Sequence, residues 1–573
     1  MDKARVRLSE STLLLVLSLV VGLCAGGAAV VLEKSIKLLQ GFTGGRFYFI
    51  FPAIGMLISL ILLRYVVKDN ISHGVTKVLL AVSRNDSQIK GHNMWSSLLT
   101  SAVTIGFGGS VGAEAPIVYT GAAFGSNLGR KARLSHRGVK VLVGCGASAA
   151  IAGIFKAPLA GVLFTLEILL FNISMSSMMP LLVSTLSATV VSYIFMGTAS
   201  PFVCTPAAFN MGNLPFYLIL GILCGVFSLY FTRFTLWLED RLQRDIPNPW
   251  VKWAVCGLGL SLLVFLFPPL FGEGYSSLRI LLNGGDVLSE GISPFHALLR
   301  TSWGVPLFFL LVMLMKVVSM TFTNAGGGVG GTFGPTLVEG ALLGFILARC
   351  LNLAGLSLPE GNFVLVGMAG LMAGVMQAPM TAIFLIAEIT GGYELLLPLI
   401  LCATTSYGIM RIREKYSIYT KRIAQSGDLL THDNDQAVLT LLRTRDLISD
   451  KYPHLHVEDT LQDISKVVSE STVAVFPVLD DGGRFCGMLE MDEIRKHIFE
   501  PDRLGSMKVR DLMHAPPGYV YEDEKMESVM RKFDRTDIWR LPALTRDGQY
   551  LGFVSRSRIL AAYRQELKQI SED

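Results

Sequence analysis

Charged side chains are scarce in this sequence, and their scarcity limits the class of protein. Of the 573 residues, 17% are Asp, Glu, Lys or Arg, whereas 51% are hydrophobic. So few charges cannot cover a large surface exposed to water, which excludes an ordinary soluble enzyme. The composition indicates a polytopic membrane protein. A nucleophile-plus-base motif is also lacking, and we predict that the chain is not an enzyme.

Paired cysteine motifs and basic clusters are missing as well. The cysteines are dispersed, mostly within apolar runs, so we expect buried thiols rather than a zinc or disulfide framework. The formal net charge is only +5 and the basic residues have no interleaved aromatics, which gives no support to a nucleic-acid partner. The eight cysteines are Cys24, Cys145, Cys204, Cys224, Cys256, Cys350, Cys402 and Cys486.

Long apolar runs are present instead. Several approach or reach the roughly 20 residues that span a bilayer. The first follows basic residues, as in a signal peptide, but it is longer than the apolar region of such a peptide, and we predict a retained spanning helix. The runs are Thr12–Val31, Phe47–Tyr65, Met179–Met196, Leu214–Phe231 and Pro306–Met320.

Basic residues flank the apolar region on both sides. By the positive-inside bias both ends are predicted to be cytoplasmic, with an even number of crossings. We therefore expect a multi-pass protein of the plasma or inner membrane, surrounded by the lipid bilayer. The flanking residues are Lys3, Arg5 and Arg7 before the region, and Arg411, Arg413, Lys415, Lys421 and Arg422 after it.

The apolar region contains an internal duplication. Gly146–Ile168 (GASAAIAGIFKAPLAGVLFTLEI) matches Gly367–Ile389 (GMAGLMAGVMQAPMTAIFLIAEI) at an offset of 221 residues (367 − 146). Upstream, Pro116–Arg130 matches Pro335–Arg349 at an offset of 219 (335 − 116). Repeated halves with helices broken by glycine and proline are typical of transporters, and the broken ends point at an ion site. The alignment leaves open whether the halves are parallel or inverted.

One glutamate lies where membrane energetics disfavour it. Glu114 belongs to Gly108–Pro116 (GGSVGAEAP) within the apolar region, where a carboxylate costs about 3 kcal/mol unless it is protonated, paired or hydrated. A glycine-rich lead-in followed by a helix that begins near Pro116 supplies free N–H groups and a positive dipole end, which together favour an anion. A side chain with its own negative charge can occupy such a site or vacate it, which is how a gate works.

The second half offers a matching helix start. In the alignment of the two halves Glu114 corresponds to Phe333, which lies within Gly330–Pro335 (GGTFGP). Two such positive ends facing one another would bind an anion without a lysine or arginine in contact. Weak binding of this kind suits conduction, because a full charge would hold the ion too tightly.

These motifs resemble the CLC family of chloride channels and chloride/proton exchangers. Gly112–Pro116 resembles the gate motif of the family, Gly331–Pro335 its Gly-x-Phe-x-Pro motif, and Ser417–Tyr419 the segment that supplies an anion-coordinating tyrosine. The resemblance implies an inverted-repeat membrane fold, a homodimer with a separate pore in each subunit, and chloride as the transported ion. We therefore expect an all-α membrane domain with broken helices.

Two departures concern the anion path. Ala113 and Ala115 replace a basic residue and a glycine of the gate motif, and the first change removes a charge that would attract anions. Ser72–Thr76 (SHGVT) replaces the Gly-Ser-Gly-Ile-Pro segment and puts His73 where a serine donates to the anion. Either the imidazole N–H or the Ser72 hydroxyl can donate instead, unless Ser72 only caps the next helix. A protonated His73 would make anion binding depend on pH.

A third departure concerns protons. In coupled exchangers of the family a second glutamate commonly follows the position of Glu167 and relays protons from the cytosol. Ile168 stands there and cannot carry a proton. Water or Glu167 can still serve, so the sequence leaves coupling open. Glu167 and Glu388 occupy equivalent repeat positions and are interpreted as structural or vestibule residues.

The resemblance gives a set of predicted site residues. Glu114 is the predicted gate and proton acceptor, and no metal ligand is predicted. The predicted anion-binding residues are Ser72, His73, Gly74, Thr332, Phe333 and Tyr419, and the predicted pore-lining or vestibule residues are Gly112, Ala113, Glu167 and Ile168.

The tail after the apolar region contains a second repeat. Phe476–Leu489 matches Leu541–Val554 at an offset of 65 residues (541 − 476), and each copy is typical of a β-hairpin preceded by a helix. This pattern resembles a pair of CBS domains. The ribose-binding Ser/Thr-x-x-Asp signature is replaced by Glu490–Glu493 and Ser555–Arg558, so a structural role is as well supported as adenine-nucleotide binding.

These patterns predict a membrane domain over residues 1–423, with halves of about 1–200 and 201–423, and α/β CBS domains over 440–500 and 505–565, on the cytoplasmic side. The predicted function is chloride or small-anion transport gated by Glu114, channel-like or weakly coupled to protons. A tightly coupled chloride/proton antiporter is the alternative. A divalent-cation transporter would need several inward carboxylates and is disfavoured by the glycine-rich helix starts.

Overall fold

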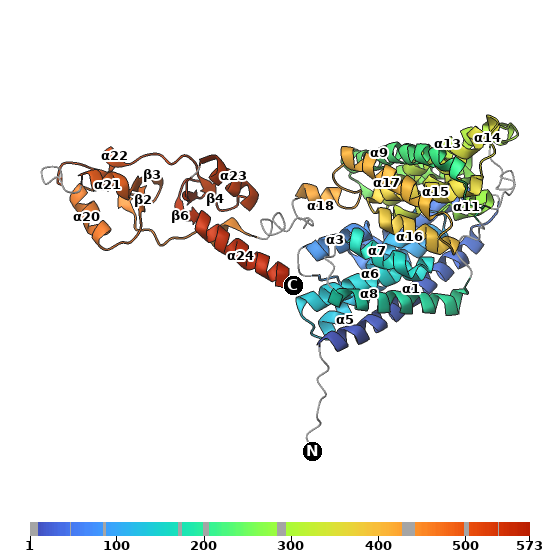
Figure 1. Ribbon diagram of the computed structural model, residues 1–573, viewed down its shortest axis with the longest axis horizontal. Helices are drawn as coiled ribbons and strands as arrows, with labels where there is room; N and C mark the ends of the chain where they lie inside the picture. The colour runs from blue at the N-terminus through green and yellow to red at the C-terminus, as the bar shows by residue number, and fades with distance from the viewer. Residues whose placement is uncertain are drawn as a thin grey trace, which may run out of the picture. The chain divides into compact units, whose positions relative to one another are not determined.

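A computed structural model describes residues 10–45, 47–83, 87–169, 175–198, 206–282, 294–426, 442–497, 504–536 and 538–572. The chain divides into two compact units, Met1–Leu429 and Leu430–Asp573. In the described residues the first unit is helical, whereas the second combines helices with two small sheets (Figure 1). The predicted fold class, a helical membrane domain followed by an α/β tandem, is confirmed.

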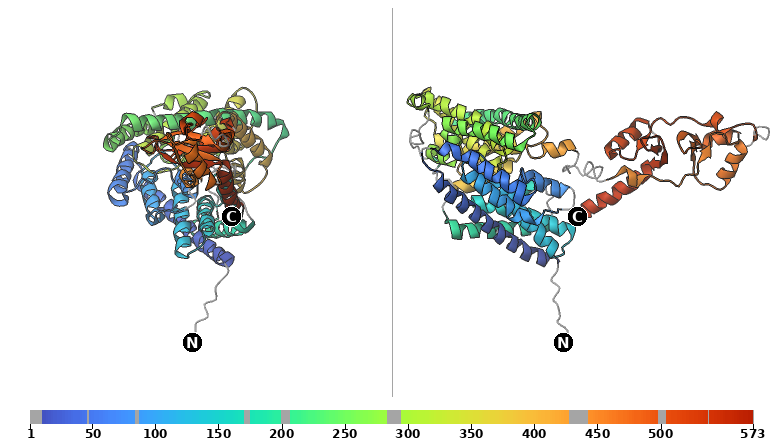
Figure 2. Two further views of the ribbon diagram at one scale, coloured as in Figure 1. Left: turned by 90° about the vertical axis from the view of Figure 1, so that its left-hand side faces the viewer. Right: turned by 180° about the vertical axis from the view of Figure 1, so that it is seen from behind.

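The helices of the first unit pack side by side, as the two further views in Figure 2 show. They are α1 (Glu10–Phe42), α2 (Phe51–Ile61), α3 (Gly74–Ser83), α4 (Ser96–Gly106), α5 (Glu114–Lys131), α6 (His136–Phe155), α7 (Pro158–Glu167), α8 (Met175–Met196), α9 (Leu214–Asp245), α10 (Pro249–Leu266), α11 (Tyr275–Leu282), α12 (His296–Leu299), α13 (Gly304–Ala325), α14 (Phe333–Leu353), α15 (Glu360–Met376), α16 (Pro379–Thr390), α17 (Leu396–Arg413) and α18 (Lys421–Ser426).

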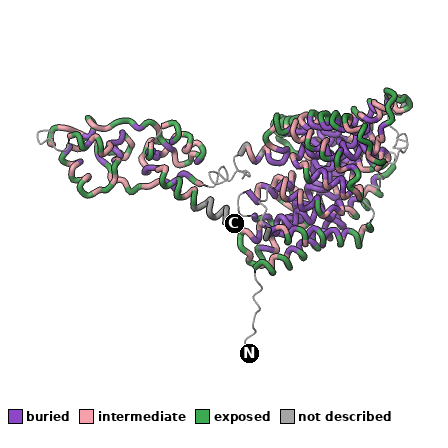
Figure 3. The backbone as a smooth tube through the Cα atoms, in the orientation of Figure 1, coloured by how far each residue is buried: buried purple, intermediate pink, exposed green. Residues whose placement is uncertain are grey.

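Eight segments of the described residues are long and apolar enough to cross a membrane. Each of the five predicted apolar runs overlaps one of them, and the first run becomes the 33-residue helix α1. Buried residues fill the interior of the unit and exposed ones follow its outer helices (Figure 3). Many of those exposed side chains are apolar, such as Leu258 at 72% exposure, which fits a surface that faces lipid.

The two sequence repeats make the same close helix crossings. An added Cβ on Gly121 would lie 2.1 Å from the carbonyl oxygen of Gly146, and one on Gly340 would lie 2.3 Å from that of Gly367. At these pairs the backbone of α5 touches that of α6, and the backbone of α14 touches that of α15. Only glycine permits so close an approach, because it has no Cβ. Because the four positions correspond through the offsets 219 and 221, the duplication read from the sequence is a duplication of structure.

The expectation that the cysteines are buried is partly wrong. Cys145, Cys224, Cys256 and Cys402 are buried, whereas Cys24 is exposed on α1 and Cys486 is exposed in the second unit. An apolar run does not distinguish a lipid-facing side chain from one in the protein interior, which explains the error for Cys24. Cys204 lies outside the described residues.

The second unit holds two copies of one small motif, as predicted. The first copy contains β1 (Leu455–His456), α20 (Leu461–Ser469), β2 (Val475–Leu479), β3 (Phe485–Glu490) and α21 (Met491–His497); the second contains α22 (Val509–Leu512), β4 (Val520–Tyr521), α23 (Met526–Thr536), β5 (Arg540–Leu544), β6 (Tyr550–Ser555) and α24 (Arg556–Glu572). In each sheet the first strand pairs parallel with the second, and the second pairs antiparallel with the third. The apolar face of α20 buries Leu461 and Ile464 but leaves Val468 half-buried, and that of α23 buries Met526, Val529 and Phe533.

Glu524 makes the stability of the second unit depend on pH. Burial raises the pKa of this carboxyl, but hydrogen bonds from Lys532, Ser528 and the Tyr521 N–H outweigh burial and hold the pKa below its ordinary value of 4.5. The stabilisation is therefore present above about pH 4.5 and lost as the pH falls through the lower pKa of the folded state. We expect hydrogen exchange of β5 and β6 in urea to report earlier unfolding below that pH.

The matched variant is Glu524→Gln, which keeps the shape of the side chain but cannot titrate. It should be less stable than wild type at pH 7, and the difference should shrink toward pH 4. An equal difference at both pH values would contradict the assignment.

Candidate functional site

The starts of α5 and α14 face one another. The Gly112 N–H donates to the Gly331 carbonyl at 2.9 Å, and the Gly331 N–H donates to the Gly112 carbonyl at 2.7 Å. The two glycines are equivalent in the repeats (331 − 112 = 219), so each half holds the other through the same bond. As predicted, two helix N-termini with free N–H groups converge on one place.

Glu114 lies between these two helix starts. It is the first residue of α5, its exposure is 2%, and its Oε2 accepts a hydrogen bond from the Gly334 N–H at 3.2 Å. Its Oε1 accepts one from the Tyr275 hydroxyl at 2.7 Å. The Glu114 side chain, which belongs to α5, therefore occupies the amino end of α14. An anion could take the place of this carboxylate.

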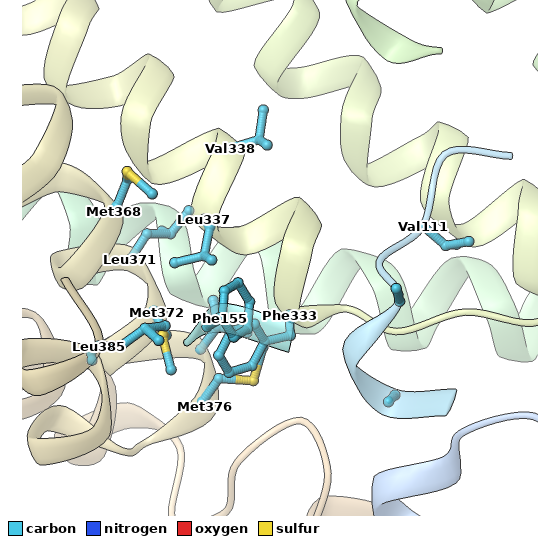
Figure 4. Packing of buried hydrophobic residues seen from close by; sticks show 14 of the residues in the cluster. Val111, Phe155, Phe333, Leu337, Val338, Met368, Leu371, Met372, Met376 and Leu385 are labelled. Atoms are coloured by element: carbon cyan, nitrogen blue, oxygen red, sulfur yellow. The ribbon is translucent and has the colours of Figure 1, made fainter. Parts of the chain in front are cut away.

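Thr332 and Phe333 come just before Gly334, whose N–H bonds Glu114, and Tyr419 interacts electrostatically with this carboxylate. The Thr332 hydroxyl donates to the Tyr419 hydroxyl oxygen at 3.2 Å, and both side chains are buried. The Phe333 ring packs against Phe155 and Phe164, with ring centroids 5.5 and 6.3 Å apart. Figure 4 shows the rings of Phe155 and Phe333 together at the start of α14. These three predicted residues therefore cluster with Glu114.

Ser72 and His73 reach the same region through a cavity of about 250 Å³, which Thr332 and Tyr419 also line. Neither side chain is free within it. The Ser72 hydroxyl donates to Asn70 Oδ1 at 2.5 Å, and His73 Nε2 lies 2.6 Å from Glu239 Oε1.

Gly74 does not line that cavity. It is the first residue of α3, and an added Cβ would meet the Ala115 carbonyl oxygen at 2.6 Å. It therefore serves the packing of α3 on α5. His73, just before it, has φ +57°, a left-handed conformation that turns the chain into α3.

A second cavity has a volume of about 380 Å³ and is lined by Glu114 itself. Glu114 and Ala113 line it together with Glu273 and Tyr275. Thr332 lines the first cavity, yet its near neighbour Gly334 bonds Glu114. The Glu114 carboxylate thus lines one cavity and bonds the start of α14, whose capping residue Thr332 lines the other. Gly112, predicted to line the pore, lines neither of these two cavities and pairs with Gly331.

Sequence reasoning missed a buried group of charges next to this site. Lys316 is 1% exposed and donates to the Ser110 hydroxyl at 2.8 Å and to the Gly272 carbonyl at 2.9 Å. Glu273 accepts from the Ala113 N–H at 3.1 Å. Glu339, fully buried on α14, interacts electrostatically with Lys316, and among the described residues its oxygens accept no hydrogen bond.

The signal that singled out Glu114 was available for all three residues. Each is an ionisable side chain within the apolar region, where a charge is costly and therefore indicates function.

Among the described residues, no group of three His, Cys, Asp or Glu side chains could hold a metal ion.

Glu167 and Glu388 cap each other's helices. Glu167 ends α7 and accepts from the Met380 and Thr381 N–H groups at the start of α16, at 2.9 and 2.7 Å. Glu388, near the end of α16, accepts from the Leu159 and Ala160 N–H groups at the start of α7, at 3.0 and 2.9 Å. Helices α7 and α16 therefore run antiparallel, and a two-fold relation between the halves exchanges the contacts.

Ile168 follows Glu167 and is 3% exposed. In the described part of the chain, neither of these two residues lines the cavity at Glu114 or the cavity at Thr332 and Tyr419.

Comparison with known proteins gives the family of both units. The model of the voltage gated chloride channel family matches residues 54–411, and the CBS domain model matches residues 445–500 and 509–565. A protein of Ralstonia nicotianae (strain ATCC BAA-1114 / GMI1000), named for its likeness to the chloride channel protein ClcB, is 29% identical over 389 residues, which cover 66% of this chain and 85% of that protein.

Two further known proteins are similar to this chain, one in sequence and one in structure. The H(+)/Cl(-) exchange transporter ClcA of Salmonella arizonae (strain ATCC BAA-731 / CDC346-86 / RSK2980) is 26% identical over 456 residues, which cover 74% of this chain and 90% of that protein. The crystal structure of a eukaryotic CLC transporter superposes with a TM-score of 0.63 at 18% identity, over 96% of this chain and 99% of the other. The second likeness shows the fold alone.

Proposed function

This chain belongs to the voltage-gated chloride channel (CLC) family, and from that premise we propose that it is a chloride pore protein whose gate is the Glu114 carboxylate and whose coupling to protons is weak or absent. Chloride transport by a multi-pass membrane protein follows from the family. The gate, the anion-binding residues and the degree of coupling are the proposal.

One observation supports the assignment of Glu114 as the gate: its Oε2 accepts the Gly334 N–H at the amino end of α14. In the proposal, chloride takes that N–H when Glu114 is protonated or displaced, because a neutral carboxyl binds a peptide N–H less strongly than a charged one does. The path then runs from the cavity lined by Glu273 and Tyr275 to the one lined by Thr332 and Tyr419.

On the far side of the gate, hydroxyl and imidazole groups are the proposed anion ligands. The hydroxyls of Thr332 and Tyr419 lie 3.2 Å apart, so together they offer a donor to an ion in that cavity. Ser72 and His73 can donate to the anion only after their hydrogen bonds to Asn70 and Glu239 break. Phe333 offers its backbone N–H to the anion, and its ring forms an apolar wall.

Weak coupling is favoured by Glu167 and Ile168. Both oxygens of Glu167 accept hydrogen bonds from α16, and its Oε2 also accepts from the Thr381 hydroxyl at 2.7 Å, so both oxygens are engaged in capping. Ile168 cannot carry a proton. The second candidate, a tightly coupled chloride/proton antiporter, is favoured by the relative that is named as an H(+)/Cl(-) exchange transporter.

The reversal potential separates the two candidates. Purified protein in planar bilayers is held under a chloride gradient, with and without an opposing pH gradient. We expect the reversal potential to follow chloride alone. A reproducible displacement by the pH gradient, in proportion to its size, would establish exchange and contradict the weakly coupled proposal.

Charge removal at the two capping glutamates tests the assignment of Glu167. Glu167→Gln and Glu388→Gln each remove a negative charge from a helix N-terminus, and we expect each to cost about 1 kcal/mol of stability, with no change in reversal potential. The two variants are matched because the residues occupy equivalent repeat positions. If Glu167→Gln altered proton movement and Glu388→Gln did not, Glu167 would be a proton carrier.

Tyr275→Phe tests how firmly Glu114 holds its place. The variant removes the hydroxyl that donates to Glu114 Oε1, a charge-assisted bond worth about 1.5 kcal/mol. The closed gate is weakened by that amount, so chloride efflux from liposomes at neutral pH should rise about tenfold. Tyr230→Phe, which removes a hydroxyl bonded to the Leu314 carbonyl, is the control. Unchanged or slower efflux in Tyr275→Phe alone would argue against the gate.

The remaining features of the proposal follow the family resemblance. They are a homodimer with one pore per subunit, cytoplasmic termini, and a CBS pair whose role is structural. In the second copy the Ser555 hydroxyl accepts the Arg558 N–H at 3.2 Å, so this serine caps α24 at the position where a nucleotide-binding copy would hold ribose.

A further inference from the structure

Glu273 stands at the amino end of α5 in the way that Glu114 stands at the amino end of α14. It lies in the loop between α10 and α11, and its Oε1 accepts the Ala113 N–H at 3.1 Å. Ala113 directly precedes α5, so this N–H is one of the donors that the helix itself cannot satisfy. Each of the two facing helix starts therefore carries one carboxylate from elsewhere in the chain.

The two carboxylates are close enough to act on one another. Glu114 and Glu273 line the same cavity of about 380 Å³, and they interact electrostatically. Tyr275, two residues after Glu273, donates to Glu114. Negative charge on Glu273 therefore repels both the Glu114 carboxylate and any anion that enters from this side.

Glu273 is more exposed to this cavity than Glu114 is. It is half-buried, whereas Glu114 is 2% exposed, so a proton from the cavity reaches Glu273 without crossing the gate. The charged and titratable groups that face it come from four elements. They are Glu114 on α5, Lys316 on α13, Tyr275 and Arg279 on α11, and Glu33 and Lys37 on α1.

We propose that Glu273 is a second regulatory carboxylate of the pore, which keeps an anion away from the amino end of α5 and sets the pH at which Glu114 releases its place. This inference rests on the proposed gate. When Glu273 is charged, its negative charge opposes chloride at the nearby amide and favours protonation of Glu114. When it is neutral, chloride is accepted more readily and Glu114 holds its charge to lower pH.

A purely structural role for Glu273 makes a different forecast. Glu273→Gln keeps a carbonyl oxygen that can accept the Ala113 N–H, so the loop stays anchored and only the charge is lost. A structural role therefore leaves the pH profile of chloride flux unchanged. A regulatory role shifts the pH profile of chloride flux.

The test measures chloride efflux from liposomes between pH 4 and 8 and chloride binding by titration calorimetry. For Glu273→Gln we expect the midpoint of the pH activation to move down by about one unit and the chloride Kd to fall about tenfold. Glu388→Gln is the matched control, because Glu388 is also a carboxylate that accepts backbone N–H groups at a helix start but lines neither of the two cavities. It should retain the wild-type midpoint and Kd.

Glu273→Asp gives an independent check that does not depend on how well the glutamine variant folds. It keeps the charge in the cavity but is too short to reach Ala113 in the same way, and we expect the wild-type midpoint within about 0.3 unit. A shift of about one unit in Glu273→Asp, or no shift in Glu273→Gln, would overturn the proposal.

The failure of this inference differs from the failure of the gate. If wild type carries no chloride, the proposed function and this inference fall together. Suppose instead that wild type carries chloride and that Glu114→Gln removes the pH dependence. If Glu273→Gln then behaves like Glu388→Gln, only the inference about Glu273 is wrong.

Discussion

Glu114→Gln is expected to carry chloride at a rate that no longer depends on pH and to move no protons. The glutamine has no charge with which to hold the Gly334 N–H against chloride, so the amino end of α14 stays available at every pH. At pH 7.5 its chloride efflux should exceed that of wild type by about tenfold or more, since a charge-assisted bond of at least about 1.4 kcal/mol is lost. Efflux from chloride-loaded liposomes, with pH recorded in parallel, measures both properties.

The control for this variant is Glu388→Gln, which neutralises a carboxylate on a helix N-terminus away from the pore. It should keep the pH dependence of wild type. A Glu114→Gln protein that elutes as wild type does and yet passes no chloride would argue against Glu114 as the gate.

Gly146→Ala is expected to destabilise the membrane unit severely. A Cβ at this position would lie 1.9 Å from the Gly121 carbonyl oxygen, so α6 must move away from α5, the helix that carries Glu114. Overpacking in a filled interior costs about 1–3 kcal/mol and sometimes more. Thermal unfolding in detergent should show a clear loss of stability, together with a fall in chloride flux.

Gly27→Ala is the matched control, because Gly27 also lies inside a helix but has no neighbour within 4 Å of the added Cβ. Alanine is the better helix former, so this variant should equal or exceed wild type in stability by up to about 1 kcal/mol. If both alanine variants were equally stable, the close crossing of α5 and α6 would not limit the fold.

The duplication was predictable from sequence because symmetry repeats the same demands at a fixed offset. The crossings at Gly121 and Gly340 require glycine in both halves, and the starts of α5 and α14 both require a glycine-rich lead-in. The hairpins of the second unit were predictable for a similar reason, since two apolar strands joined by a glycine-containing turn recur 65 residues apart.

The partners of Glu114 were not predictable in the same way. Glu273 comes from the loop before α11 and Tyr275 is the first residue of that helix. Both are far from Glu114 in sequence, and nothing in their spacing relates them to it. Only tertiary packing brings that loop to the gate. The energetic argument used for Glu114 would have singled out Glu273 as an ionisable residue, but without its position.

The segment with His73 illustrates a second limit. The motif predicted a donor that points at the anion, yet the imidazole engages Glu239, which lies on α9. A buried carboxylate 166 positions away is invisible to a local motif and competes directly for the same N–H group. The family pattern therefore located this segment without fixing what its side chains bind.

The central claim is that the Glu114 carboxylate and a halide compete for the amino end of α14. Crystals of wild type and of Glu114→Gln soaked in bromide, with anomalous data collected at the bromine edge, test it most directly. The account predicts a bromide peak within hydrogen-bond distance of the Gly334 N–H in Glu114→Gln and none there in wild type at neutral pH, where the carboxylate fills the place. A bromide peak at that N–H in wild type beside an undisplaced Glu114, or no peak there in either protein, would contradict it.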